Sequence, residues 1–349
     1  MTQISRAQVL PAEWAPQSAV MLTWPHIHSD WATILPQVEP VYVAIAREVA
    51  RREKLVVACY DEAHRDHVWH RLSSAGVDLE QVRLFLVPSN DTWARDHGPI
   101  TVLRDGNPAI LDFRFNGWGN KYRHDLDNQI TPRLQAAGAF GATPLESIPL
   151  VLEGGGIESD GVDTLMTTAH CQLSPERNPK FDRAQLTELL RRHFGTPRVL
   201  WLEHGHLAGD DTDGHIDTLA RFCDAETIAY VTCTDPADEH YLPLLEMEAE
   251  LRSFRTAAGR PYHLVPLPLP QPHYGDDGRR LPATHANFLI INGAVLVPTY
   301  NDVVDALVLE RLAKCFPDRE VIGIDCSPLI RQYGSLHCIT MQIPAGVVA

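Results

Sequence analysis

Residues 96–113 read DHGPITVLRDGNPAILDF, which is two apolar runs joined by Asp105-Gly106. An Asp-Gly or Asn-Gly pair between two apolar runs is a strong β-hairpin signal, because these residues tolerate a positive φ. The same pattern recurs at 153–168 around Asp160-Gly161, at 214–232 around Asp224-Ala225, and at 286–300 around Asn292-Gly293. An earlier strand at 18–24 and a last one at 337–344 complete the set. The chain therefore contains a weak internal repeat.

Helical patterns separate these hairpins. Apolar residues recur at helical spacing in four segments, 40–53, 180–195, 243–259 and 305–317. Short apolar runs follow, such as 198–202 and 320–325. The unit is hairpin, helix, strand, and it recurs roughly every 50 to 75 residues, a range typical of repeat architectures. We expect an α/β fold in which residues 1–349 form a single domain.

Composition narrows the class of protein. The 349 residues are 44% hydrophobic and 21% charged, as in a soluble globular protein. No apolar run reaches the ~20 residues that span a bilayer, and the N-terminus lacks the pattern of a signal peptide. The net charge of −15 argues against nucleic acid and suits a cationic substrate. Seven cysteines without a Cys-x-x-Cys pair argue against a disulfide framework. We predict a cytoplasmic protein with no membrane partner, and a homodimer as the commonest assembly.

The proline-rich segment 264–282 is expected to be a long surface loop, because proline blocks regular hydrogen bonding. A lid over a pocket is the functional interpretation of this segment, and an ordered loop without a role is the alternative.

Each hairpin opens with polar residues. These are Asp96, Glu153, His215 with Asp217, Asn287, and His337 with Cys338. If the units surround an axis, the hairpin starts meet at one end of it and line a central pocket.

Cys338 is the candidate nucleophile, since a nearby histidine or a positive field favours the reactive thiolate. Adjacent side chains of a strand point to opposite faces, so His337 is read as a packing or surface residue. His215 is the better acid/base candidate. It lies two residues from Asp217, and the two side chains share a face if this segment is a strand.

The carboxylates and Trp93 indicate the substrate. A guanidinium is planar and cationic, and carboxylates bind its N–H groups in pairs. Asp96 and Asp217 are expected to hold it from two sides, with Trp93 against its flat face or alkyl tail. Glu153 precedes three glycines, where backbone approaches a neighbour closely, and Gly155 among them is a candidate substrate-binding residue.

Five ordered motifs resemble the agmatine deiminase family of guanidine-modifying enzymes. They are NDTWARDHGP (90–99), LEGGGIESDG (152–161), DGHIDTLARF (213–222), NFLIINGAVLVPTY (287–300) and LHCITMQ (336–342). The segment 165–179, read as helical, also matches. The resemblance runs from about residue 10 to the C-terminus, and five motifs in order are far more specific than one.

The resemblance implies a pentein fold, with five ββαβ units around a pseudo-fivefold axis. It also implies metal-free and cofactor-free hydrolysis of a guanidine to a urea with release of ammonia. By this resemblance Cys338 is the nucleophile and His215 the general acid and then base. Asp96 and Asp217 bind the guanidinium, and Glu153 orients His215 and the substrate. The expected reaction converts agmatine to N-carbamoylputrescine through a thiouronium intermediate on the cysteine.

Two stretches depart from the family pattern. In WPHIHSDWA (24–32), Trp24, Pro25 and Trp31 match the family, while His26, Ile27 and Ala32 do not. Before the nucleophile, 333–336 reads YGSL where the family carries glycines and asparagine. Both stretches are expected to shape the surroundings of the substrate tail. Peptidyl-arginine or another guanidine therefore stays open beside agmatine, and free arginine is less favoured for want of a basic pair.

Two other classes remain open. Residues 204–217, HGHLAGDDTDGHID, offer several possible metal ligands, although their spacing is no standard zinc set and lacks the last glutamate of an EF-hand. A metal-dependent hydrolase is therefore one alternative. The other is a non-catalytic guanidine binder or an amidino-group transferase on the same scaffold.

Overall fold

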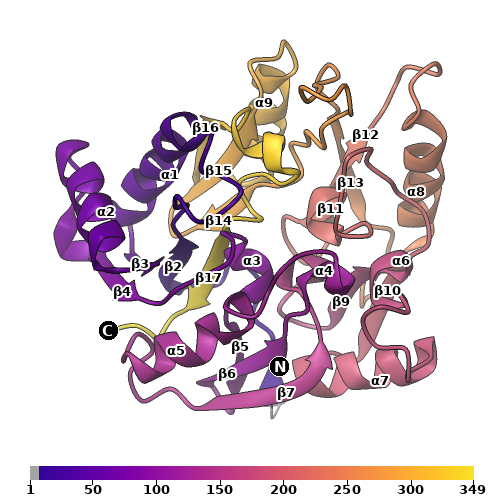
Figure 1. Cartoon of the computed structure of the whole chain (residues 1–349). Helices are drawn as coiled ribbons and strands as arrows, with labels where there is room; N and C mark the ends of the chain where they lie inside the picture. The colour runs from indigo at the N-terminus through magenta and orange to yellow at the C-terminus, as the bar shows by residue number, and fades with distance from the viewer. Residues whose placement is uncertain (1–7) are drawn as a thin grey trace.

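Five small sheets surround a central axis in the computed structural model, which describes residues 8–349 (Figure 1). The longer helices lie on the outside of this ring. The first seven residues of the expected 1–349 domain lie outside the described residues. Over residues 8–349, none of the helices combines the length and apolar character that crossing a bilayer requires.

Four of the sheets repeat one unit, in which an antiparallel hairpin is followed by a helix and a third strand parallel to the second. The first unit consists of β5 (Ile100–Arg104), β6 (Asn107–Arg114), α5 (Ile130–Ala136) and β7 (Leu145–Val151). The second consists of β8 (Ile157–Ser159), β9 (Thr164–Thr168), α7 (Arg183–Phe194) and β10 (Arg198–Leu202). The third consists of β11 (Ala220–Phe222), β12 (Thr227–Thr232), α8 (Tyr241–Ser253) and β13 (His263–Pro268). The fourth consists of β14 (Leu289–Ile291), β15 (Ala294–Thr299), α9 (Asp305–Cys315) and β16 (Glu320–Asp325).

The fifth unit joins the two ends of the described chain. Strand β17 (Thr340–Pro344) pairs antiparallel with β2 (Gln17–Thr23), and β3 (Lys54–Cys59) and β4 (Val82–Leu86) extend the sheet in parallel. Helices α1 (Leu35–Ala50) and α2 (Glu62–Ser74) make the connections, and β1 (Gln8–Val9) pairs with β5 of the neighbouring sheet. The predicted α/β arrangement of five ββαβ units is therefore confirmed.

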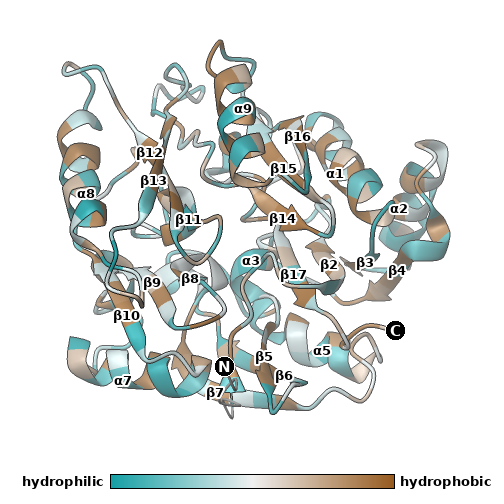
Figure 2. Ribbon diagram, turned by 180° about the vertical axis from the view of Figure 1, so that it is seen from behind, coloured by the Kyte–Doolittle hydropathy of each residue, from teal (hydrophilic) through white to brown (hydrophobic). Residues whose placement is uncertain are grey.

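Local sequence explains the unit. Asp105 and Gly106 both adopt positive φ, 49° and 81°, as a two-residue hairpin turn requires. Helix α7 begins at a capping box and ends before Gly195, which has a φ of 63°. Its buried residues Leu186, Leu190 and Phe194 recur every fourth position and face the sheet. Figure 2 shows the result, with apolar strands inside and helices that carry one apolar and one polar side.

Two predictions about local structure are wrong. Residues 264–268 of the expected proline-rich loop belong to β13, which pairs in parallel with β12. Prolines are tolerated there because β13 is the edge of its sheet. The segment 165–179 was read as helical, but it begins in strand β9, and only the short α6 (Ala169–Gln172) within it is an α-helix.

His97 anchors the short helix α3 (Ala94–His97) to the interior. Its Nε2 lies 2.9 Å from the Thr23 hydroxyl of β2, and its backbone carbonyl accepts a hydrogen bond from Thr131. Burial lowers the pKa of His97 from 6.5 to about 3. The folded protein therefore resists protonation at this ring, while the unfolded chain accepts the proton.

The free energy of unfolding should fall as the pH drops from 6.5 towards 3, because the unfolded state binds more protons in this window. Between pH 7 and pH 5 the loss from His97 should be about 2 kcal/mol. In His97→Gln, whose side chain stays neutral, the pH-dependent loss measured by urea titration should be smaller by that amount. The exposed His70→Gln is the control and should behave as wild type. An unchanged loss in His97→Gln would contradict this role.

Candidate active site

The polar residues that open the hairpins meet at one end of the axis. Asp96 lies on α3, His215 immediately precedes the short turn η4 (Ile216–Thr218), and Asp217 lies within it. His215 Nδ1 is 3.6 Å from Asp96 Oδ1, and Cys338 Sγ is 3.9 Å from Asp217 Oδ2. Asp217 thus lies in a 3-10 turn and His215 directly before it, not on a strand, but both side chains lie beside Gly155, so their expected proximity is present.

Gly155 leaves a space between these groups. A Cβ atom added to Gly155 would lie 2.6 Å from His215 Nδ1, 2.9 Å from Asp96 Oδ1 and 3.2 Å from Asp217 Cγ. The Gly155 amide donates a hydrogen bond to Asp96 Oδ1 at 3.0 Å. The glycine turn η3 (Gly154–Gly156) therefore forms the wall of a small polar space, as the three glycines predict.

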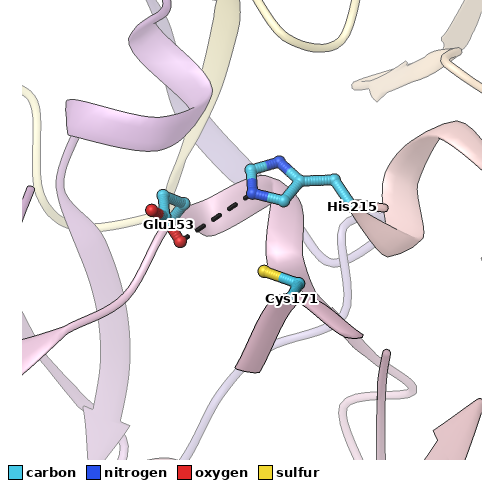
Figure 3. A group of neighbouring side chains, drawn as sticks. All are labelled: Glu153, Cys171 and His215. Carbon is cyan, nitrogen blue, oxygen red and sulfur yellow. Dashed lines mark ion pairs between the residues drawn. The ribbon is translucent and has the colours of Figure 1, made fainter. Parts of the chain in front are cut away.

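His215 is enclosed and free to exchange protons. It is 1% exposed, and neither ring nitrogen has a hydrogen-bond partner. Figure 3 shows its Nε2 facing Glu153, whose Oε2 lies 3.8 Å away. Burial disfavours the imidazolium, but Asp96 and Cys171 outweigh burial and raise the pKa of His215 well above its ordinary value. The ring therefore holds a proton that it can deliver.

Glu153 is fixed by Arg177, whose Nε lies 3.0 and 2.9 Å from its two carboxylate oxygens. Arg177 also reaches Asp213 Oδ2 at 2.6 Å. Burial alone would raise the pKa of Glu153, but His215 and Arg177 together lower it. Glu153 is therefore a rigid anion beside the imidazole.

Asp217 is held from behind by His337. The Nδ1 of His337 lies 2.7 Å from Asp217 Oδ2, and its Nε2 lies 2.7 Å from Glu13 Oε2. Glu13 also pairs with Arg221 at 2.9 Å. Burial opposes the charge on Asp217, yet His337 lowers its pKa. The interpretation of His337 as a packing or surface residue was therefore incomplete, because its buried ring bridges two carboxylates.

Asp96 depends on Trp118, a residue that the sequence analysis missed. The indole Nε1 donates to Asp96 Oδ2 at 2.9 Å, and burial raises the pKa of this carboxyl. Trp118 has φ 54° and ψ 47°, a left-handed conformation that is costly for a bulky side chain such as tryptophan. The available signal in the sequence for this residue was a tryptophan between two glycines, in the stretch NGWGN at 116–120.

The thiol of Cys338 lies between Asp217 and Asn287. Its Sγ is 3.4 Å from Asn287 Oδ1, and that oxygen also accepts from the amides of Cys338 and His337. The side chain is buried, and 6% of the residue is exposed. Burial, reinforced by Asp217 and Asp96, raises the pKa of the thiol well above its ordinary value. Without a cation in the site, Cys338 is therefore a thiol and not a thiolate.

A pocket leads from Cys338 and Asp96 to the surface. Its remaining lining residues are Asp30, Asp91, Trp93, Trp118, Tyr122, Asp210, Asp211, Thr212, Thr218, Gln332, Tyr333 and Gly334. Of the described residues that line it, none is lysine or arginine. Trp93 donates to Asp91 Oδ2 at 2.9 Å, which fixes the indole at the pocket wall. The opening is acidic and aromatic.

Tyr333 and the loop after β13 border this opening. Arg279 lies over the Tyr333 ring at 5.0 Å, and Arg331 pairs with Asp276 at 3.0 Å. A Cβ atom at Gly334 would lie 2.2 Å from the Trp93 ring, so only glycine fits beside it. Residues 269–282 thus approach the pocket rim, while their movement as a lid stays a prediction.

The candidate metal ligands of 204–217 do not gather into one site among residues 8–349. His204 pairs with Glu250 at 2.9 Å, and Asp210 accepts hydrogen bonds from the amides of Thr212 and Gly214. The donor group that the described chain does form is Glu153, Cys171 and His215 (Figure 3). Only His215 of this group belongs to 204–217, and Cys171 was not singled out from the sequence.

Known proteins share this chain's architecture along almost its full length. A Porphyromonas gingivalis protein named "Putative Arginine Deiminase" is 52% identical, with a TM-score of 0.92, over 98% of this chain and 100% of that one. The Campylobacter jejuni agmatine deiminase, solved with substrate bound as a C315S variant, is 37% identical over 97% of both chains, with a TM-score of 0.90. The agmatine deiminase of Stutzerimonas stutzeri is 30% identical over 97% of this chain and 96% of its own.

These likenesses confirm the pentein fold. Residues 9–344 match the model of the Porphyromonas-type peptidyl-arginine deiminase family. The chain belongs to this family, and agmatine deiminases are among its relatives.

Proposed function

We propose that this protein hydrolyses a guanidine to a urea with release of ammonia, and that its substrate is agmatine, which becomes N-carbamoylputrescine. The observation that carries the proposal is the set of Cys338, His215, Asp96 and Asp217 around the space left by Gly155. The agmatine deiminases among the relatives support this choice of reaction.

Asp96 and Asp217 hold the planar guanidinium from two sides by charge-assisted hydrogen bonds. When the guanidinium binds, the Cys338 thiol releases its proton to solvent. The thiolate Sγ attacks the guanidino carbon, and His215 donates a proton to the nitrogen that leaves as ammonia. His215 then takes a proton from water, which attacks the thiouronium carbon. The C–S bond breaks, the proton of the new hydroxyl group passes to the sulfur, and the ureido product leaves with the thiol restored. Glu153 orients His215 and the substrate throughout.

The substrate itself activates the nucleophile. Burial and the two carboxylates keep Cys338 protonated in the free protein. A bound guanidinium places positive charge between the same carboxylates and the sulfur, and so lowers the thiol pKa. The thiolate therefore forms mainly when its target is present.

The pocket opening supports agmatine over free arginine. Asp30, Asp91, Asp210 and Asp211 surround it, and of the described lining residues none is basic. An acidic opening attracts the distal ammonium of agmatine and repels an α-carboxylate. Arg279, above Tyr333 at the rim, is the feature that favours the alternative, a peptidyl-arginine whose chain extends outward.

We further propose that residues 1–349 act as one catalytic domain, which the pairing of β17 with β2 supports because it joins both ends of the described chain. The cytoplasmic location and the homodimer stay predictions. The proposed reaction requires no cofactor.

Incubation with agmatine should release ammonia and N-carbamoylputrescine in equal amounts, because one C–N bond is exchanged for one C–O bond. Agmatine should give a higher kcat/KM than arginine or a C-terminal arginyl peptide, owing to the acidic opening. Cys338→Ala should abolish turnover while calorimetry still detects agmatine binding. Equal or better turnover of arginine would remove agmatine as the substrate, and binding without ammonia release by wild type would indicate a non-catalytic binder.

Cationic 2-chloroacetamidine should alkylate Cys338 about 100-fold faster than neutral 2-chloroacetamide, because only the cation lowers the thiol pKa on binding. Rates are normalised to the same reagents with glutathione, and mass spectrometry identifies the modified cysteine. The normalised preference should shrink in Asp217→Asn. If the ratio of the two alkylation rates at Cys338 equals the ratio measured with glutathione, the site does not couple cation binding to thiolate formation.

Gly155→Ala should lower kcat/KM for agmatine by at least about 100-fold, since the new methyl group occupies the space between His215 and the carboxylates. Its backbone φ is not positive, so any fall in the unfolding midpoint should come only from crowding of His215 and Asp96 by the new methyl group, and the midpoint is measured to verify folding. Gly275→Ala, in the loop at 269–282, is the matched control, because the new methyl meets only the movable Asp277 side chain. Full activity of Gly155→Ala would place the guanidine elsewhere.

A further inference from the structure

We propose that Glu153, Cys171 and His215 form a binding site for a soft divalent cation of the zinc class, and that the bound ion inhibits the enzyme. The inhibitory part rests on the proposed function of His215, whereas the binding part does not.

The three side chains come from separate segments and converge on one point. Glu153 follows β7, Cys171 lies on α6 and His215 precedes η4. One ligand atom from each residue lies within 4.8 Å of the others, and His215 Nε2 and Glu153 Oε2 are 3.8 Å apart. Tetrahedral zinc with bonds of about 2.0–2.3 Å places its ligand atoms about 3.3–3.8 Å apart, so small shifts of these side chains would close the site around the ion. Figure 3 shows the three groups facing a common space.

His215 gives an independent indication of a ligand. Its Nε2 is buried, and its ion-pair partner Glu153 Oε2 lies 3.8 Å away, which is beyond hydrogen-bond distance. The nitrogen thus has unused hydrogen-bonding capacity in the interior, which costs free energy unless another group satisfies it. The nitrogen points towards Glu153. A cation between Nε2, the carboxylate and the sulfur would satisfy all three groups at once.

The local charge also fits a cation. Glu153 Oε2 lies 2.9 Å from Arg177 Nε, and Asp213 Oδ2 lies 2.6 Å from Nη1 of the same guanidinium, so two carboxylates share one positive charge. Asp96 lies on the other side of the imidazole at 3.6 Å from Nδ1. Zinc binds cysteine as the thiolate and histidine through an unprotonated ring nitrogen, so binding releases the protons on these ligand atoms to solvent. The resulting thiolate and the carboxylates then balance the charge of the metal.

Occupancy would stop catalysis at the proton-transfer steps. With its Nε2 bound to the ion, His215 can no longer alternate between imidazolium and imidazole, so it neither protonates ammonia nor accepts a proton from water. The nucleophile is a different cysteine, Cys338, which keeps its own place beside Asp217. This difference separates the proposed site from simple capture of the nucleophile by a thiol-binding metal.

Cobalt binding tests the site without any assay of turnover. Co²⁺ bound to a thiolate gives a charge-transfer absorption band in the near ultraviolet. Titration of Cys338→Ala with Co²⁺ should produce this band, and the added Cys171→Ser substitution should abolish it. Cys233→Ser in the Cys338→Ala background is the control for a distant thiol and should keep the band. Absence of the band in Cys338→Ala, or its presence in the Cys338→Ala/Cys171→Ser double variant, would refute the proposed site.

Zinc inhibition tests the consequence. Each protein is compared with its own rate without metal, and the Zn²⁺ concentration for half-inhibition should rise at least about tenfold in Cys171→Ser. If Cys171→Ser does not fold, anomalous diffraction from Zn²⁺-soaked wild-type crystals should place the ion on Cys171 Sγ and His215 Nε2. An ion on Cys338 instead would refute the proposal. Absence of turnover by the metal-free wild type refutes the proposed function but leaves the cobalt result intact.

Discussion

The completely buried carboxylate of Asp217 constrains the architecture of this site. Charge in the interior is costly unless it is hydrogen-bonded, and His337 Nδ1 lies at hydrogen-bond distance from Asp217 Oδ2, at 2.7 Å. The other nitrogen of His337 needs its own partner, and Glu13 supplies it from the N-terminal segment. Glu13 in turn pairs with Arg221, which also binds Glu158 at 2.8 Å. A guanidine-binding surface thus requires a second layer of buried ions behind it.

That second layer needs a closed ring. Glu13 lies just before β2, Arg221 lies on β11 and His337 lies just before β17, so its members are far apart in sequence. Pairing of β17 with β2 brings the N-terminal and C-terminal segments together and places Glu13 behind His337. Removing one charge would leave the others unpaired in the interior, which is strongly destabilising. The ring closure and the chemistry of the pocket are therefore coupled.

Periodicity and turn chemistry made the fold predictable, since hairpins and helices are local patterns. The strands 198–202 and 320–325 agree with β10 and β16 residue for residue. Prolines concealed β13, because sequence does not reveal which strand is an edge. The convergence of the hairpin starts followed from the repeat. Glu13 was missed because its partners Arg221 and His337 lie more than 200 residues away in the sequence. The direction of His337 was misjudged because a turn lacks the alternation of a strand.

The same carboxylates have opposite effects on the two reacting partners. They attract the guanidinium but raise the thiol pKa of Cys338, so a free site gains affinity at the expense of nucleophilicity. The positive charge of the substrate offsets this conflict during the first step of the proposed reaction. Hydrolysis of the thiouronium removes that charge, because a urea is neutral. The carboxylates then lose their counter-ion and the sulfur regains its proton, which weakens the hold on the product. The loss of one charge in the chemistry thereby drives both product release and deactivation of the nucleophile.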